Sequence, residues 1–226
     1  MAEQPSSATT SPGVMDLLRD GTADLHRRAE TQPFQIALVK ATVTRDEYAT
    51  WLGQMRLIHS RLERHLATLR TGQARLAPLL RDELMQSPRL AADLRVLGHD
   101  PDSITALPSV SRFVEYLDDL ATRDPLALMG VHYVLEGSKN GNSFIARALA
   151  KAWDVNPRES AAAMSYLDPH GDQQRPLWQE FRGVMNAIEF EPAQRDAMLE
   201  AARETFAAVG DLAGELLESA EADPQA

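Results

Sequence analysis

The apolar residues of this chain recur every three or four positions along most of its length, and no segment alternates convincingly between apolar and polar residues. This spacing places the apolar side chains on one side of an α-helix. The clearest stripe contains Trp51, Met55, Ile58 and Leu62. The pattern predicts helices over residues 14–30, 44–69, 110–121, 125–153, 156–167, 174–188 and 192–217, with two shorter pieces within 77–97. We therefore expect one all-α domain, a bundle of about eight helices.

Several local signals mark where these helices begin or break. Thr44 and Glu47 have the spacing of a capping box, in which each side chain bonds a backbone N–H at the start of a helix. Asn156-Pro157 is a second start signal. Ser87-Pro88 predicts a break within 77–97, because proline removes a helical hydrogen bond.

The two ends of the chain differ from the middle in composition. Residues 1–13 are rich in Ser, Thr, Ala and Pro, and residues 218–226 are acidic and small. We expect two flexible tails around a domain over 14–217. No run of about 18 apolar residues and no basic, apolar leader is present, so we expect no membrane anchor and a cytoplasmic location.

The charge and cysteine content restrict the possible functions. The 226 residues carry a net charge of −10, which argues against nucleic acid as a partner. The chain has no cysteine, which excludes disulfides, thiolate catalysis and thiolate metal sites.

Two glycines interrupt the predicted helix 125–153. Gly137 and Gly141 are four residues apart and so lie on one side of it, although glycine costs about 1 kcal/mol relative to alanine inside a helix. Close packing of a neighbouring helix would explain them. A bare face that lets a large flat group reach the backbone would also explain them.

Candidate ligands for such a group lie elsewhere in the chain. His26 is near the end of the first helix, and Glu30, four residues on, can reach one ring nitrogen and leave the other for a metal. Arg19 lies two turns before His26 on the same face, and Arg182 follows Phe181. Arginine suits carboxylates because its planar fork binds two oxygens.

A second set of residues allows a different chemistry. His59 and Glu63, and likewise His132 and Glu136, are His-x-x-x-Glu pairs on helices. Two facing pairs could hold one or two iron or manganese ions, as in carboxylate-bridged helical bundles. Such spacing also arises by chance in a helical protein rich in glutamate.

From about Asp16 to Leu217 the chain resembles the heme oxygenase family. The resemblance rests on four segments in the right order: Leu18–Glu30, which is similar to the family's proximal helix, Val43–Asp46, the distal glycines Gly137–Gly141, and Phe181–Glu189 followed by Pro192 and Phe206. It implies an enzyme that oxidises heme to biliverdin, iron and carbon monoxide, using dioxygen and electrons from a donor such as ferredoxin or a reductase. Heme is then both cofactor and substrate.

The resemblance also implies roles for individual residues. His26 is similar to the axial ligand of the heme iron and Glu30 to its acidic partner. Arg19 and Arg182 match basic positions that meet the heme propionates, and Phe206 belongs to the heme-binding part. The distal, catalytic segment comprises Gly137, Ser138, Gly141 and Asn142.

The distal segment departs from the family's best-known pattern. Ser138 stands where an aspartate follows the first glycine, and Asn142 stands where a further glycine often follows the second. His59 replaces a tyrosine of the distal water network. Three hypotheses follow: a heme oxygenase, a heme-binding protein of the same fold without turnover, and a non-heme iron oxidase. The biliverdin isomer, the electron donor and the oligomeric state stay open.

Overall fold

The computed structural model describes residues 13–222, and this part of the chain consists of α-helices joined by turns and 3-10 segments, without a β-strand. The α-helices are α1 (Val14–Glu30), α2 (Pro33–Lys40), α3 (Arg45–Gly72), α4 (Ser87–Val96), α5 (Pro108–Arg123), α6 (Leu128–Ala152), α7 (Gln174–Ala187) and α8 (Pro192–Ala222). The all-α prediction is confirmed. No helix among residues 13–222 combines the length and apolarity needed to cross a bilayer.

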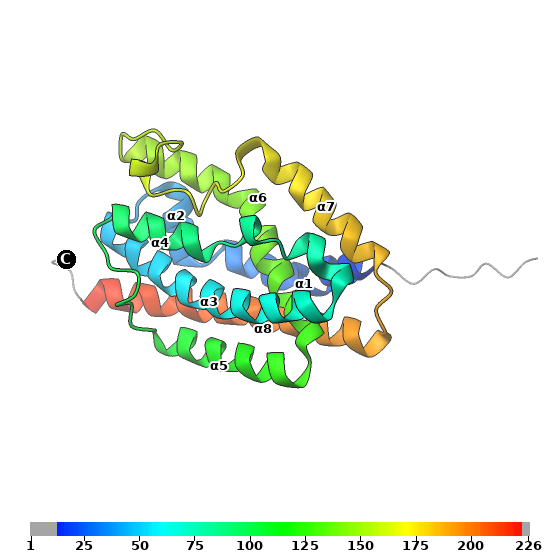
Figure 1. Ribbon diagram of the computed structural model, residues 1–226. Helices are drawn as coiled ribbons and strands as arrows, with labels where there is room; N and C mark the ends of the chain where they lie inside the picture. Colours follow the sequence, from blue (N-terminus) through cyan, green and yellow to red (C-terminus); the bar gives the residue numbers. More distant parts are fainter. Residues whose placement is uncertain (1–12, 223–226) are drawn as a thin grey trace, which may run out of the picture.

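Helix α8 packs against most of the other α-helices. It packs along α1 and against α6, while α3 packs against α4 and α5 (Figure 1). The contact between α6 and α8 is close at Gly130, where an added Cβ would lie 1.9 Å from the carbonyl oxygen of Met198. Any larger residue at this position would push the two helices apart.

Three helices begin on side chains that come from elsewhere in the fold. The Asn186 side chain of α7 accepts from the backbone N–H of Met15 at 3.1 Å. Glu63 of α3 accepts from the N–H of Ser87 at the start of α4, and Glu215 of α8 accepts from the N–H of Ser109 near the start of α5. Such bonds satisfy N–H groups that a helix leaves unpaired at its first turn.

The predicted capping box at α3 is confirmed. The backbone N–H of Glu47 donates to the Thr44 hydroxyl at 3.2 Å, and the N–H of Thr44 donates to the Glu47 carboxylate at 2.6 Å. Helix α3 begins at Arg45, directly after this cap.

Several predictions of helix position are wrong. The sequence analysis missed α2, an eight-residue helix that starts at Pro33 and ends where Ala41 is left-handed, with φ 53°. The helix predicted over 156–167 is absent except for a 3-10 turn at 160–162. The first piece within 77–97 is 3-10 rather than α-helical, but the predicted break near Ser87-Pro88 is confirmed, because α4 begins at Ser87 with Pro88 in its first turn.

The first and last helices involve residues just outside the range 14–217. Gly13 is the N-cap of α1, and α8 continues past Leu217 to Ala222. Residues 1–12 and 223–226, which include most of the two predicted tails, lie outside the described residues.

Helix α6 changes direction near its middle, where its glycines lie (Figure 1). Glycine is one recognised cause of bends in long helices. Two sides of α6 have different surroundings: Glu136 and Lys139 are buried with His59 of α3, whereas Gly137 lies against Trp178 of α7.

Candidate functional site

His26 lies on an exposed side of α1. Its side chain is 60% exposed, and its Nδ1 is 3.6 Å from the carboxylate of Glu30. The imidazole meets the ring of Phe206 from α8 edge-on, at 5.9 Å between ring centres. A carboxylate beside Nδ1 favours the tautomer with hydrogen on that atom, which leaves the lone pair on Nε2. The three residues predicted here therefore form one group.

Gly141 belongs to an exposed strip of α6 that also contains Ser138 and Phe144. We call this strip, together with Gly137, the glycine face. No atom outside the helix backbone lies within 4 Å of where a Cβ of Gly141 would be, and Phe144 is 68% exposed. The hydroxyl of Ser138 donates to the carbonyl of Leu135 at 2.8 Å. This part of α6 is open to a large group.

Gly137 has different surroundings from Gly141. An added Cβ would lie 3.4 Å from Cη2 of Trp178 on α7, so the indole of Trp178 rests on the backbone of Gly137. Of the two explanations for the glycines, close packing applies to Gly137 and an open backbone to Gly141.

Asn142 does not join the other predicted catalytic positions. Its side chain is on the buried side of α6, and the residue is only 9% exposed. One position equals about 100° of rotation around a helix, which turns Asn142 away from the strip of Gly141. In this structure Asn142 therefore lies on a different side of α6 from Gly141 and Ser138.

Tyr133 connects α6 to α1 and lies near both predicted arginines. Its hydroxyl lies near Thr22, which is one turn before His26. Burial raises the pKa of Tyr133, and the polar side chain of Thr22 and the positive charges of Arg19 and Arg182 oppose this effect. Arg19 and Arg182 come from different helices and yet act on the same hydroxyl.

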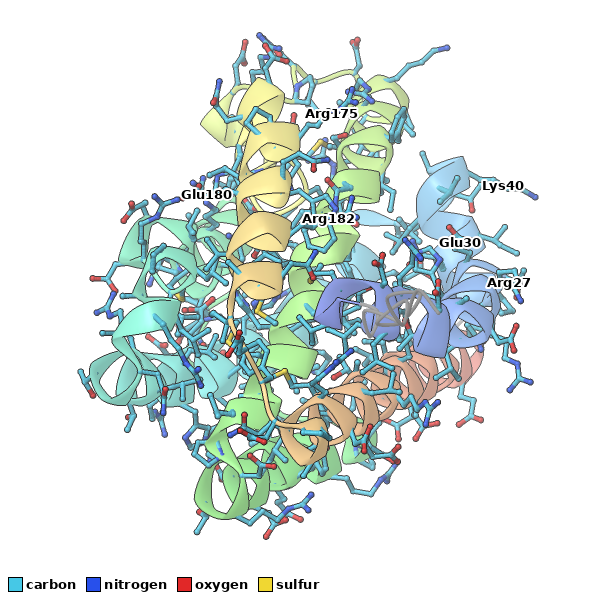
Figure 2. All side chains as sticks on the ribbon, turned by 90° about the vertical axis from the view of Figure 1, so that its right-hand side faces the viewer. Arg27, Glu30, Lys40, Arg175, Glu180 and Arg182 are labelled. Atoms are coloured by element: carbon cyan, nitrogen blue, oxygen red, sulfur yellow. The ribbon has the colours of Figure 1, made fainter. Side chains whose placement is uncertain are left out.

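The two arginines differ in what engages them. The guanidinium of Arg19 donates to Asp16 at 2.9 Å and to Asp20 at 2.8 Å, and the contact with Arg19 lowers the pKa of Asp20. Figure 2 shows Arg182, and above it Arg175, on the side of α7 near α6, with Glu30 across from them on α1. Arg182 is thus better placed than Arg19 to meet a ligand beside the glycine face.

The second predicted set, His59, Glu63, His132 and Glu136, does come together. All four line one small cavity of about 10 Å³, room for about one water molecule, and Lys139 lines it with them.

The carboxylates in this cavity are already engaged. The amino group of Lys139 lies 2.6 Å from Glu136. Glu63 accepts from the N–H groups of Gln86 and Ser87, at 2.5 and 3.1 Å. Burial would raise the pKa of Glu63, but hydrogen bonds from His59 and Ser87 and from the backbone of Gln86 hold it below its ordinary value.

The charge balance of the cavity opposes a pair of metal ions. An ammonium and a helix N-terminus already supply the positive charge that two metal ions would bring. Within residues 13–222 no group of three or more His, Asp or Glu side chains has the arrangement of a metal site. The donor set therefore does not fit two metal ions.

Three residues of these two regions were missed by the sequence analysis. Trp178 borders the glycine face, Tyr133 packs against Trp178, and Lys139 completes the buried cluster. Spacing could have indicated them: Trp178 is one turn before Arg182, Tyr133 is one turn before Gly137, and Lys139 is seven residues after His132.

Comparison with known proteins places these observations in a family. A model of the family described as heme oxygenase matches residues 13–215. The chain belongs to the heme oxygenase family. It is 24% identical to human heme oxygenase 1 over 208 residues, which cover 90% of this chain and 72% of the human protein. Heme oxygenase 2 of Synechocystis is also 24% identical, over 84% of this chain and 77% of the relative.

Solved structures show the same fold. The structure of Synechocystis heme oxygenase 2 in complex with heme and NO superposes with a TM-score of 0.83, at 22% identity, over 93% of this chain and 88% of the other. The TenA homologue from P. horikoshii superposes with a TM-score of 0.65 at 15% identity, over 91% of this chain and 100% of the other. The fold is therefore shared beyond heme oxygenases, so function has to be argued from the site residues.

Proposed function

We propose that this protein is a heme oxygenase, which binds heme between His26 of α1 and the glycine face of α6. Heme oxidation would yield biliverdin, iron and carbon monoxide, with dioxygen as oxidant and electrons from a donor such as ferredoxin or a reductase. We further propose that the protein acts in the cytoplasm.

The observation that carries this proposal is that the structure offers both an exposed histidine, His26, and an open stretch of helix backbone at Gly141. An exposed imidazole with a carboxylate at Nδ1 can offer Nε2 to an iron. The open backbone at Gly141 leaves room for a flat ring and a small ligand, which a side chain would obstruct. Family membership and the heme in the relative's structure support the same assignment.

The remaining residues fit heme in their chemistry. Heme is a flat apolar disc with two propionates on one edge. The exposed ring of Phe144 and the half-buried ring of Phe206 suit the disc, and the guanidinium of Arg182 suits a propionate. Arg19 could contribute to the positive potential at this edge, although Asp16 and Asp20 bind it.

Bound heme would supply the iron at which dioxygen is reduced. The protein's own part would be to hold the iron by His26, to keep the distal side narrow through α6, and to hold a water near Ser138. In the structure the Ser138 hydroxyl donates to Leu135, so its oxygen can still accept a hydrogen bond from water.

A second candidate function is heme binding without turnover. Ser138 lacks the negative charge of the aspartate that is typical at this position, and Asn142 is turned inward. Both differences weaken control of protons at the distal side. Heme binding requires only His26, the open backbone and the arginines.

A hemin titration followed by reduction in air tests both candidates. The wild-type protein should give the absorption spectrum of a histidine-ligated heme, and a reductant should convert it to the spectrum of a bile pigment. His26→Ala should lose the ligated spectrum. His99→Ala, at a partly exposed histidine beside Asp46, is the matched control and should behave as the wild type. A heme band that persists through many reducing equivalents would favour binding alone.

A further inference from the structure

The indole of Trp178 covers one end of the glycine face and leaves the other end open. Its Cη2, Cζ2 and Cζ3 atoms lie 3.4, 3.8 and 3.9 Å from the position of a Cβ on Gly137. At Gly141, one turn further along α6, the corresponding space is empty to 4 Å. A flat ring that lies along α6 over Gly141 therefore meets Trp178 at Gly137.

Neighbouring rings hold Trp178 in place. Its indole stacks on Phe181, with 5.4 Å between ring centres and 10° between planes, and lies against Tyr133 at 5.9 Å. Phe181 is only 4% exposed and meets the ring of His132 edge-on. The ring on which Trp178 stacks is therefore part of the buried core. Aromatic contacts of this kind favour one orientation of each ring. The indole is thus a fixed wall.

Two arginines of α7 flank the indole of Trp178, one before it and one after it in the sequence. Arg175, Trp178 and Arg182 are spaced by three and four residues, which places them on one face of the helix. Figure 2 shows Arg175 and Arg182 on the side of α7 near α6. An amphipathic ring with acidic groups on one edge matches this order of basic, aromatic and basic side chains.

We propose that Trp178 is a positioning residue that limits how far the heme ring turns in its own plane about the iron held by His26, and so sets which meso edge lies beside the open backbone at Gly141. This inference rests on the proposed function. An indole at Gly137 blocks one direction of this turn, while the open backbone at Gly141 accepts the edge of the ring. Removing the indole frees space over Gly137, and the ring then has more than one seating.

Proton NMR of the ferric, cyanide-bound complex tests this proposal without turnover. The heme methyl resonances report the seating of the ring, and separate sets of signals report the populations of two seatings. Trp178→Ala should change the methyl shifts and alter the population ratio by about 2- to 10-fold, the weight of one aromatic contact in an equilibrium. Trp178→Phe, which keeps a smaller ring, should give an intermediate change.

Trp153→Phe is the matched control. Trp153 follows α6 about 24 Å along the helix from Gly137, where it packs on Tyr48 and beneath Arg45. Its replacement should leave the heme signals unchanged. During turnover, Trp178→Ala should also broaden the distribution of biliverdin isomers.

The outcomes separate this proposal from the proposed function. Wild-type protein that binds no hemin would refute the function itself. Hemin binding with methyl signals that are identical in the wild type and in Trp178→Phe and Trp178→Ala would overturn only the role of Trp178. If Trp178→Ala does not fold, Trp178→Phe alone decides: an altered spectrum supports the proposal and an identical one overturns it.

Discussion

The amino group of Lys139 lies 2.6 Å from the carboxylate of Glu136, and the two side chains are only 2% and 7% exposed. They occupy the buried side of α6, away from Gly141 on its exposed side. Burial lowers the pKa of Lys139, against the opposing charge of Glu136. Burial would raise the pKa of Glu136, but the charge of Lys139 holds it below its ordinary value. Each of the two side chains therefore needs the opposite charge of the other to remain charged while it is buried.

Removing one member of this pair should cost far more stability than removing both. Lys139→Met keeps the length of the side chain but leaves Glu136 as an uncompensated buried charge, so we expect a loss of about 3–5 kcal/mol. The double variant Lys139→Met with Glu136→Leu should recover most of that loss, because well-packed apolar residues can replace a buried ion pair. Urea unfolding of the wild type and the two variants measures both quantities.

Lys151→Met on the exposed surface of the same helix is the control for this comparison. It should change the free energy of unfolding by less than about 0.5 kcal/mol. A single Lys139→Met variant as stable as this control would show that Glu136 does not depend on Lys139.

Stability should fall as the pH is lowered below about 6.5. Burial lowers the pKa of His132 from its ordinary value of 6.5, so between the two values the unfolded chain binds a proton that the folded protein does not. Glu63 and Glu136 also have folded pKa values below the ordinary 4.5, so their contribution is complete above 4.5 and is lost as the pH falls through the folded values. All three groups act in the same direction.

Urea unfolding at about pH 8 and about pH 5 measures this pH dependence. In His132→Gln the free energy of unfolding should fall less between pH 6.5 and 4.5. The fall below 4.5, which comes from Glu63 and Glu136, should remain. An unfolding free energy that does not change between these two pH values would contradict the account of His132.

Replacement of Asp93 should lower the free energy of unfolding strongly. Its carboxylate is buried and accepts from the N–H of Ser165 at 3.1 Å, the hydroxyl of Ser165 at 2.8 Å and the N–H of Tyr166 at 2.8 Å. Asp93→Ala leaves these donors unpaired, with an expected loss of about 2–3 kcal/mol. Exposed Asp172→Ala is the control, and equal melting temperatures for the two variants would count against this role of Asp93.

Asp93 also shows why part of the fold could not be predicted from the sequence. The segment 156–167 has a helix start signal at Asn156, but Ala163 is left-handed with φ 55°, and Asp93 binds the backbone of Ser165 and Tyr166. These contacts join residues about 70 positions apart, and no local pattern indicates them. The capping box at Thr44, by contrast, uses only neighbours in sequence and was predicted correctly.

In the candidate site, too, contacts between neighbours in sequence could be predicted, and contacts between different helices could not. His26 and Glu30 are one turn apart, so their proximity could be predicted from spacing alone. Glu63 looked like a partner for His59 by the same rule, but most of its hydrogen bonds go to the start of α4. Spacing along one helix predicts which side chains are neighbours, whereas the approach of other helices decides what those side chains bind.

A bulky side chain at Gly141 should block heme without harming the fold. Nothing lies within 4 Å of a Cβ at this position, so Gly141→Leu can be accommodated in the absence of heme. It should even raise the free energy of unfolding by about 0.5–1 kcal/mol, because leucine favours a helix more than glycine does. Hemin, however, would meet the new side chain. We expect its affinity to fall by about 10- to 100-fold, which corresponds to the cost of overpacking a site.

The control for Gly141 is Gly214→Leu on α8, where an added Cβ also meets nothing within 4 Å. This variant should gain similar stability and bind hemin as the wild type does. Thermal unfolding without heme and hemin titration of each variant give the two quantities. Loss of affinity in both variants would point to a general effect of leucine. Full affinity in Gly141→Leu would show that heme does not lie over Gly141, and with it the proposed position of heme on α6 would be wrong.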